Sequence, residues 1–167
     1  MVTSELLKSL EPFKELNAVQ LGKLQKYCEE IEFEFNEKLF TQGDPAMHLW
    51  VVVDGAVDLR FEMPDRRPSS PDQTVDSVEV MEREPEAKVL GWSCFVPPYK
   101  MRLSAVCISK SCSIVRVDKG ELFNLFQEDP LMGYLFMSYM IKVVGYRFHQ
   151  FQNHVAKNLG EDLMFGW

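Results

Sequence analysis

The sequence predicts a mainly β fold with flanking helices: an antiparallel β sandwich or jelly roll (double-stranded β-helix), with short helices before it and a long helix after it. Two observations predict it. The apolar period is helical before Glu30, alternates as far as Val117, and is helical again after Asp118. Turn residues divide the alternating part at short intervals, as in sandwiches and barrels. At 167 residues we expect one domain, 1–167, made of N-terminal helices (1–29), a β jelly roll (30–117), C-terminal helices (118–160) and a tail (161–167).

The N-terminal part is expected to contain two short helices within residues 3–27, separated at the Glu11-Pro12 step. Asn17 can cap the second helix, with Gln20 three residues later as its capping-box partner. The apolar residues that follow recur at helical spacing, which indicates a packing surface.

The first strand is predicted from Glu30 to Phe35, where Glu alternates with apolar residues as in a strand with one wet face. Further strands are expected at 39–40 and at 49–53. The run at 49–53 ends at Asp54-Gly55, the strongest two-residue hairpin signal in the chain, which predicts that residues 56–61 pair with it.

Residues 63–74 are rich in Pro, Ser and charge and predict a mobile loop. A strand is expected at 75–81 and a charged turn at 82–88. Residues 104–108 and 113–117 are predicted to pair with each other across a short turn.

The C-terminal part predicts two helices. Asp118 as N-cap and Glu121 form a capping box for the first. Pro130 suits the first position of the second helix, which can extend to Leu159 with Gly160 as its stop signal. Such a helix is longer than a small domain needs to cover its own core.

Six apolar residues recur at three- and four-residue spacing along the long helix: Met137, Met140, Val144, Phe148, Phe151 and Val155. We predict that this stripe is the interface of a homodimer, in which the same helix of a second copy covers it. The alternative is a stripe folded back on its own domain.

The segment on which the functional interpretation depends runs from Val89 to Val106 and is called the cassette below. It contains Gly91, a short apolar bend, Pro97-Pro98 and a lone Arg102 before the next strand. Backbone N–H groups of a glycine turn together with one guanidinium can bind an anion such as a phosphate. The alternative is a bent connection between two strands.

Composition excludes several classes of protein. A net charge of −7 and a pI near 5 disfavour direct nucleic-acid binding. No apolar run is long enough for a membrane span, and the N-terminus lacks a signal-peptide pattern, so we expect a cytoplasmic protein. The cysteines, expected to be reduced thiols, are Cys28, Cys94, Cys107 and Cys112.

Nothing in the sequence indicates catalysis, so we expect no enzyme activity and no metal. The chain lacks the GxSxG, HExxH and P-loop motifs. His149 and His154 are five residues apart on the long helix and do not share a face, which argues against joint metal ligation. A cupin-like metalloenzyme would need a His/Glu cluster on the strands that the sequence does not show.

The order of elements and several motifs resemble the cyclic nucleotide-binding domain family, over about residues 10–158. Phe40-Thr41-Gln42-Gly43-Asp44 is similar to the family's strand-turn, and Leu49 to Val57 is similar to its hairpin motif with Asp54-Gly55. The cassette lies where the family has its phosphate-binding loop. The resemblance is to bacterial stand-alone members, because the chain given ends at Trp167 with no DNA-binding helix-turn-helix.

The resemblance implies a ligand site formed by the cassette: Gly91, Trp92, Ser93, Cys94, Arg102, Leu103 and Ser104. Arg102 stands at the place of the family's phosphate-binding Arg, and Ser104 would donate its hydroxyl to a phosphate oxygen. The family's Glu, which accepts the ribose hydroxyl, is replaced by Trp92. An indole only donates, so it cannot replace a carboxylate acceptor.

The predicted function is therefore a non-catalytic ligand-sensing or regulatory module without a resident cofactor, which binds cAMP, cGMP or another small anion at the cassette. The alternative is an interaction or scaffold module that has kept the fold and lost the ligand. The resemblance also leaves open a haem with His48 or His149 as its axial ligand.

Overall fold

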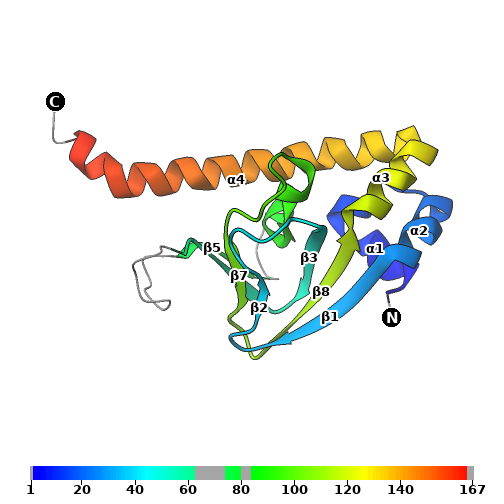
Figure 1. Cartoon of the computed structure of the whole chain (residues 1–167), viewed down its shortest axis with the longest axis horizontal. Helices are drawn as coiled ribbons and strands as arrows, with labels where there is room; N and C mark the ends of the chain where they lie inside the picture. The colour runs from blue at the N-terminus through cyan, green and yellow to red at the C-terminus, as the bar shows by residue number, and fades with distance from the viewer. Residues whose placement is uncertain (1, 63–73, 80–83, 165–167) are drawn as a thin grey trace.

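The computed structural model describes residues 2–62, 74–79 and 84–164. It confirms the predicted architecture: an antiparallel β sandwich, short N-terminal helices and a long C-terminal helix lying across one side of the sandwich (Figure 1). No helix in this part of the chain has the length and apolarity needed to cross a membrane. The loop prediction for 63–73, and the end of the strand predicted at 75–81, lie outside the described residues.

The N-terminal helices are α1 (Ser4–Ser9), η1 (Glu11–Phe13), α2 (Ala18–Leu24) and η2 (Gln25–Tyr27). The predicted capping box of α2 is confirmed. Asn17 Oδ1 accepts from the N–H groups of Val19 and Gln20, and Gln20 Oε1 accepts from the N–H of Asn17 at 3.0 Å. Gln20 also donates to Asp129 at 2.8 Å, which connects α2 to the start of the last helix.

Each sheet of the sandwich has four strands in the described part of the chain. The first sheet has, in spatial order, β1 (Cys28–Glu34), β8 (Ser111–Asp118), β3 (His48–Asp54) and β6 (Val89–Leu90). The second has β2 (Lys38–Phe40), β7 (Ser104–Cys107), β4 (Ala56–Arg60) and β5 (Thr74–Glu79). Both sheets contribute buried side chains to one apolar core, among them Leu49, Val51, Val57, Ala105, Ile114 and Val115.

The predicted hairpin at Asp54-Gly55 is wrong. β3 pairs with β8 and β6 in the first sheet, whereas β4 pairs with β5 and β7 in the second. Gly55 has a φ of +88°, so its left-handed backbone makes a corner that takes the chain from one sheet to the other. A turn signal predicts such a conformation, but it does not say which strands hydrogen-bond on either side.

The predicted pairing of 104–108 with 113–117 is also wrong, because the two strands belong to different sheets. β7 lies between β2 and β4, and β8 lies between β1 and β3, so the chain changes sheet between them. Both strands bury apolar residues in the same interior from opposite sides. β7 is buried along its whole length and β8 buries Cys112, Ile114, Val115 and Val117, so neither burial pattern identifies the partner strand.

Two helices follow the sandwich: α3 (Lys119–Glu128) and α4 (Pro130–Met164). The predicted N-cap is confirmed, since Asp118 Oδ1 accepts from the N–H groups of Gly120 and Glu121. The predicted end of α4 at Leu159 is wrong, because the helix continues through Gly160. A glycine within a helix lowers helix stability by only about 1 kcal/mol relative to alanine, so a single glycine is not enough to end a helix. Residues 165–167 of the predicted tail lie outside the described residues.

Candidate ligand-binding cavity

The cassette begins with a conformation that only glycine fits. β6 leads into Gly91, whose φ is +79°, and the short helix η5 (Trp92–Phe95) follows. A Cβ on Gly91 would lie 2.7 Å from the backbone oxygen of His48 and 2.8 Å from Cδ1 of Trp50. Gly91 therefore packs closely against His48 and Trp50 of β3, and this contact positions the start of η5.

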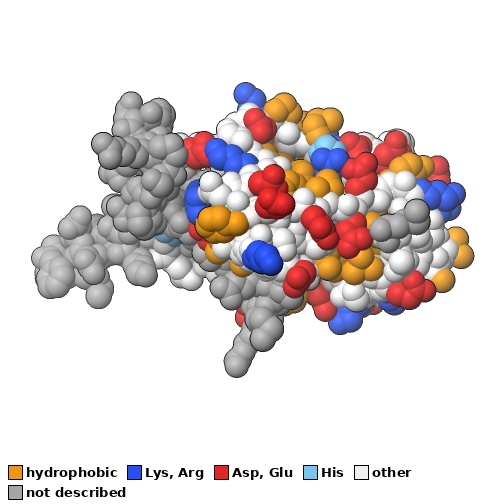
Figure 2. Space-filling view, turned by 90° about the horizontal axis from the view of Figure 1, so that it is seen from below, with side chains coloured by type: hydrophobic (Ala, Val, Ile, Leu, Met, Phe, Trp, Pro, Cys, Tyr) orange, Lys and Arg blue, Asp and Glu red, His pale blue; other side chains and the backbone are white. Residues whose placement is uncertain are grey.

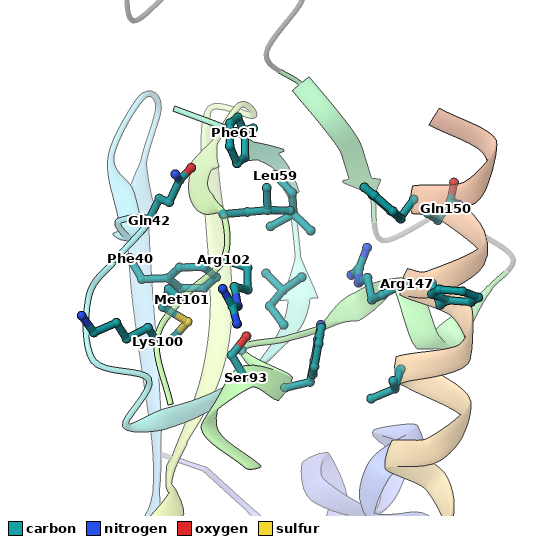
Figure 3. Close-up of a pocket in the computed structure, with 18 of the residues that line it drawn as sticks. Phe40, Gln42, Leu59, Phe61, Ser93, Lys100, Met101, Arg102, Arg147 and Gln150 are labelled. Carbon is teal, nitrogen blue, oxygen red and sulfur yellow. The ribbon is translucent and has the colours of Figure 1, made fainter. Parts of the chain in front are cut away.

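A cavity of about 780 Å³, called the α4 cavity below, lies between the cassette, the second sheet and α4 (Figure 3). The second sheet and its adjoining turns contribute Phe40, Gln42, Gly43, Leu59 and Phe61. The cassette contributes Leu90, Gly91, Trp92, Ser93, Pro98, Lys100, Met101, Arg102 and Leu103. The α4 helix contributes Val144, Arg147, Phe148, Gln150, Phe151 and His154. The volume is in the range of small-molecule sites.

Most of the residues predicted for the ligand site line this cavity: Gly91, Trp92, Ser93, Arg102 and Leu103. Cys94 and Ser104 do not. Cys94 belongs to η5 and is fully buried, and its N–H donates to the carbonyl of Gly91 at 2.9 Å. That N–H is therefore used within the cassette.

Ser104 is fully buried and its hydroxyl is already engaged. It donates to Glu62 Oε1 at 2.8 Å and accepts from the N–H of Gln42, also at 2.8 Å. Lys38 donates to the same Glu62 oxygen at 2.6 Å, and this bond, followed by that from Ser104, lowers the pKa of Glu62. Ser104 therefore holds the adjoining ends of β2, β4 and β7 together instead of facing a ligand.

Arg102 and Ser93 supply the uncommitted polar groups of the α4 cavity. The Arg102 guanidinium and the Ser93 hydroxyl point toward each other across its lower part (Figure 3). Within the described part of the chain, neither side chain has a hydrogen-bond or ion-pair partner. A guanidinium and a hydroxyl without partners are suited to bind an anionic group.

The other ionisable side chains that line the α4 cavity are also basic residues. Arg147 reaches from α4 and donates to the carbonyls of Ala87 and Val89, so it ties the helix to the strand that leads into the cassette. Lys100 and His154 lie on the same lining, and no Asp or Glu does so among the described residues. The cavity thus has a positive environment in a chain of net charge −7.

Three side chains that could support catalysis or haem binding, Cys94, His48 and His149, are not placed to do so at this cavity. Burial raises the pKa of the Cys94 thiol to about 12, so it stays protonated and is a poor nucleophile at neutral pH. His48 and His149, the residues considered for a haem, do not line the α4 cavity. In the part of the chain that the structure describes, no group of His, Cys, Asp and Glu side chains is arranged to hold a metal ion.

The residues predicted as a dimer interface are divided between different surroundings. Val144, Phe148 and Phe151 line the α4 cavity. Met140 is 3% exposed and packs in the core of its own chain, so it has little surface to offer a second copy. Met137 is exposed, and Val155 is half-buried.

Sequence reasoning missed the contribution of α4 to this cavity. Val144, Arg147, Phe151 and His154 recur at intervals of three, four and three residues, which places them on one helix face. Two basic residues within an otherwise apolar face were the available signal. The contributions of Phe40, Leu59 and Phe61 follow only from the sheet arrangement.

The face of the molecule shown in Figure 2 carries no broad basic region among its described residues. On the face in Figure 2, Asp and Glu side chains are spread among apolar ones, with single Lys and Arg side chains between them. Such a face lacks the clustered positive charge with which proteins neutralise nucleic-acid phosphates.

Comparison with known proteins shows the fold. No family model and no curated protein matches the chain. Among solved structures, a protein of Geobacter metallireducens GS-15 with the provisional name of a cyclic nucleotide-binding protein superposes with a TM-score of 0.71 at 23% identity, over 89% of this chain and 100% of that one. A cyclic nucleotide-binding domain from Methylobacillus flagellatus KT gives 0.70 at 17% identity, over 94% and 80%.

A third similar structure is the sensor domain of the transcriptional regulator DNR from Pseudomonas aeruginosa, with a TM-score of 0.66 at 16% identity over 87% of this chain and 91% of that one. All three sequence identities are low, so these similarities show the fold of the chain but not which ligand or chemistry its site supports. Each superposition nevertheless covers 80% or more of both chains. The chain therefore has the fold of the cyclic nucleotide-binding domains.

Proposed function

We propose that this protein is a non-catalytic, ligand-sensing regulatory module whose ligand, a small anion, binds in the α4 cavity. The observation that carries the proposal is the pairing of an uncommitted guanidinium, Arg102, with an uncommitted hydroxyl, Ser93, on the lining of a cavity of ligand size. The similarity to sensor and cyclic nucleotide-binding domains supports a regulatory role.

The position of the α4 cavity supports a sensing role as well. Its lining comes from the sandwich on one side and from the last helix on the other. A ligand that fills it would contact both, and would therefore change the free energy with which α4 is held against the sandwich. Arg147 already joins α4 to the segment before the cassette.

Replacing Arg102 with glutamine is expected to weaken anion binding by about ten- to a hundredfold, because a charge-assisted hydrogen bond contributes about 1.5–3 kcal/mol. Titration calorimetry with cAMP, cGMP and naphthalene-2-carboxylate checks this on wild type and variant. The matched control is Lys110→Gln, which removes an exposed charge at the turn between β7 and β8, at a residue that does not belong to the cavity lining. If none of these anions binds the wild type, the scaffold alternative is favoured.

We further propose that the protein is a homodimer through a different stripe of α4 from the one predicted. Leu131, Tyr134 and Ile141 are exposed, and with the small residues Ser138 and Gly145 they recur at three- and four-residue spacing. The opposite side of the helix, with Phe136, Met140 and Val143, packs in the core of its own chain. Large and small residues alternating on an exposed seam suit pairing with an identical helix.

The expected result for Ile141→Glu is a monomer at tens of micromolar, where the wild type is a dimer, because two glutamates would face each other in the seam. Light scattering measures the difference. Val19→Glu is the matched control, since Val19 and Ile141 are both 72% exposed but Val19 lies on α2. A monomeric wild type at that concentration would rule out the dimer.

A further inference from the structure

We propose that the ligand of the α4 cavity is an aromatic carboxylate, or an organic anion of the same chemistry with a flat apolar body and one acidic group, and not a sugar phosphate. This inference rests on the proposed function and specifies the ligand of the same site. Three features of the lining carry it: its aromatic walls, its single uncommitted guanidinium, and the lack of carboxylate acceptors among the described residues that form it.

Aromatic side chains line the cavity from three sides. Phe40 and Phe61 adjoin the second sheet, Trp92 begins η5, and Phe148 and Phe151 come from α4. Figure 3 shows Phe40 and Phe61 on the side opposite the helix. Aromatic faces separated by an open space suit a ring system, which can be contacted on its face and on its edges at the same time.

The polar groups are too few for a nucleotide. A ribose hydroxyl buried in the cavity needs an acceptor, but no Asp or Glu is present on the described lining. The Gln42 Oε1 already accepts from the N–H of Glu62 at 2.8 Å. The Gln150 amide nitrogen donates to the Tyr146 hydroxyl at 2.7 Å, and the Gln150 carbonyl and the Ser93 hydroxyl remain only as neutral acceptors, which bind a hydroxyl less strongly than a carboxylate does. Trp92 presents an indole, which only donates.

A buried sugar hydroxyl without a partner would lower affinity by about ten- to a hundredfold relative to a ligand that lacks it. An aromatic carboxylate avoids this cost, since its oxygens only accept hydrogen bonds and its body has no polar group to satisfy. Arg102 and Ser93 are both donors, and they meet this requirement at one end of the cavity. Most of the remaining lining is apolar, and its other polar side chains are Gln42, Lys100, Arg147, Gln150 and His154.

The test is calorimetric titration of the full chain with four probes: naphthalene-2-carboxylate, the neutral naphthalene-2-carboxamide, cAMP and inorganic phosphate. The carboxylate is expected to bind at least tenfold more tightly than each of the others. The amide has the same ring without the charge, and phosphate has the charge without the ring. Their comparison therefore separates the two parts of the site.

Three variants assign the contacts. Arg102→Gln is expected to weaken the carboxylate by about ten- to a hundredfold and leave the amide unchanged. Arg102→Lys keeps the charge but loses the fork that binds two oxygens, so it is expected to restore part of the loss. Phe148 is 57% exposed, so Phe148→Ala is expected to fold as the wild type does and to weaken both ring probes alike.

The outcomes separate the ligand class from the proposed function. Tighter binding of cAMP than of the carboxylate, with loss in Arg102→Gln, would overturn the aromatic-anion proposal and leave the sensing function standing. Equal binding of carboxylate and amide, unaffected by Arg102→Gln, would overturn the role of the anionic group. If none of the four probes binds, the aromatic-anion proposal and the sensing function fail together.

Discussion

Replacing Phe136 with alanine is expected to lower the free energy of unfolding by about 3–5 kcal/mol, as for other large aromatic residues truncated in a core. Phe136 is 1% exposed and lies on the buried side of α4. Its ring contacts Phe13 of η1, Phe95 of η5 and Phe126 of α3, with centroids 5.1–6.0 Å apart. One side chain therefore joins the N-terminal helices, the cassette and α3 to the last helix.

Chemical denaturation of wild type and Phe136→Ala, with circular dichroism as the signal, measures this effect. The matched control is Phe35→Ala, because Phe35 is 67% exposed and its truncation is expected to change stability by less than about 0.5 kcal/mol. A loss below about 1 kcal/mol in Phe136→Ala would show that α4 is not held to the sandwich by this contact.

Replacing Gly55 with alanine is the second large effect. The new Cβ would lie 2.5 Å from the backbone oxygen of Ser111 and 2.7 Å from Cα and Cβ of Cys112. The φ of +88° adds about 1–2 kcal/mol of strain for any residue with a side chain, and forcing the β8 backbone aside adds about 1–3 kcal/mol. We therefore expect a total loss of about 2–5 kcal/mol.

Gly43→Ala separates these two contributions. Gly43 has a φ of +90°, close to that of Gly55, but a Cβ there would meet nothing within 4 Å. It is expected to lose only the backbone strain, about 1–2 kcal/mol. Thermal or chemical unfolding of both variants gives the comparison, and equal losses in the two would show that the corner between the sheets does not depend on a close approach to β8.

Much of the fold could be predicted from the sequence because the relevant signals are local. The change of hydrophobic period at Glu30 and again at Asp118 separates the helical parts from the sandwich. The caps at Asn17 and Asp118 are formed by side chains two or three residues from the groups they bind. Such interactions are encoded in neighbouring residues.

Strand pairing could not be predicted in the same way. The residues on either side of Gly55 have the composition of a hairpin, yet they belong to different sheets. What decides between a hairpin and a corner is the packing of Gly55 against Ser111 and Cys112, more than fifty residues along the chain. Contacts at that separation have no local sequence signature.

The sequence predicted the part of the site that the cassette forms, but not the part that α4 forms. The cassette follows from Gly91 and Arg102, which stand at recognisable places in the order of elements. The apolar stripe of α4 predicted a dimer interface or a contact with its own domain but no ligand, because an apolar stripe has the same sequence pattern whether it faces a ligand or a second copy. Only the position of α4 along the sandwich shows that Phe148 and Phe151 line a cavity.

The central claim is that an organic anion occupies the α4 cavity between the cassette and α4. A crystal structure of the protein with naphthalene-2-carboxylate tests it most directly. The expected result is a carboxylate within hydrogen-bond distance of the Arg102 guanidinium and the Ser93 hydroxyl, with its ring between Trp92 and Phe148. Density for the probe only outside this cavity, or inside it with the carboxylate turned away from Arg102, would contradict the claim.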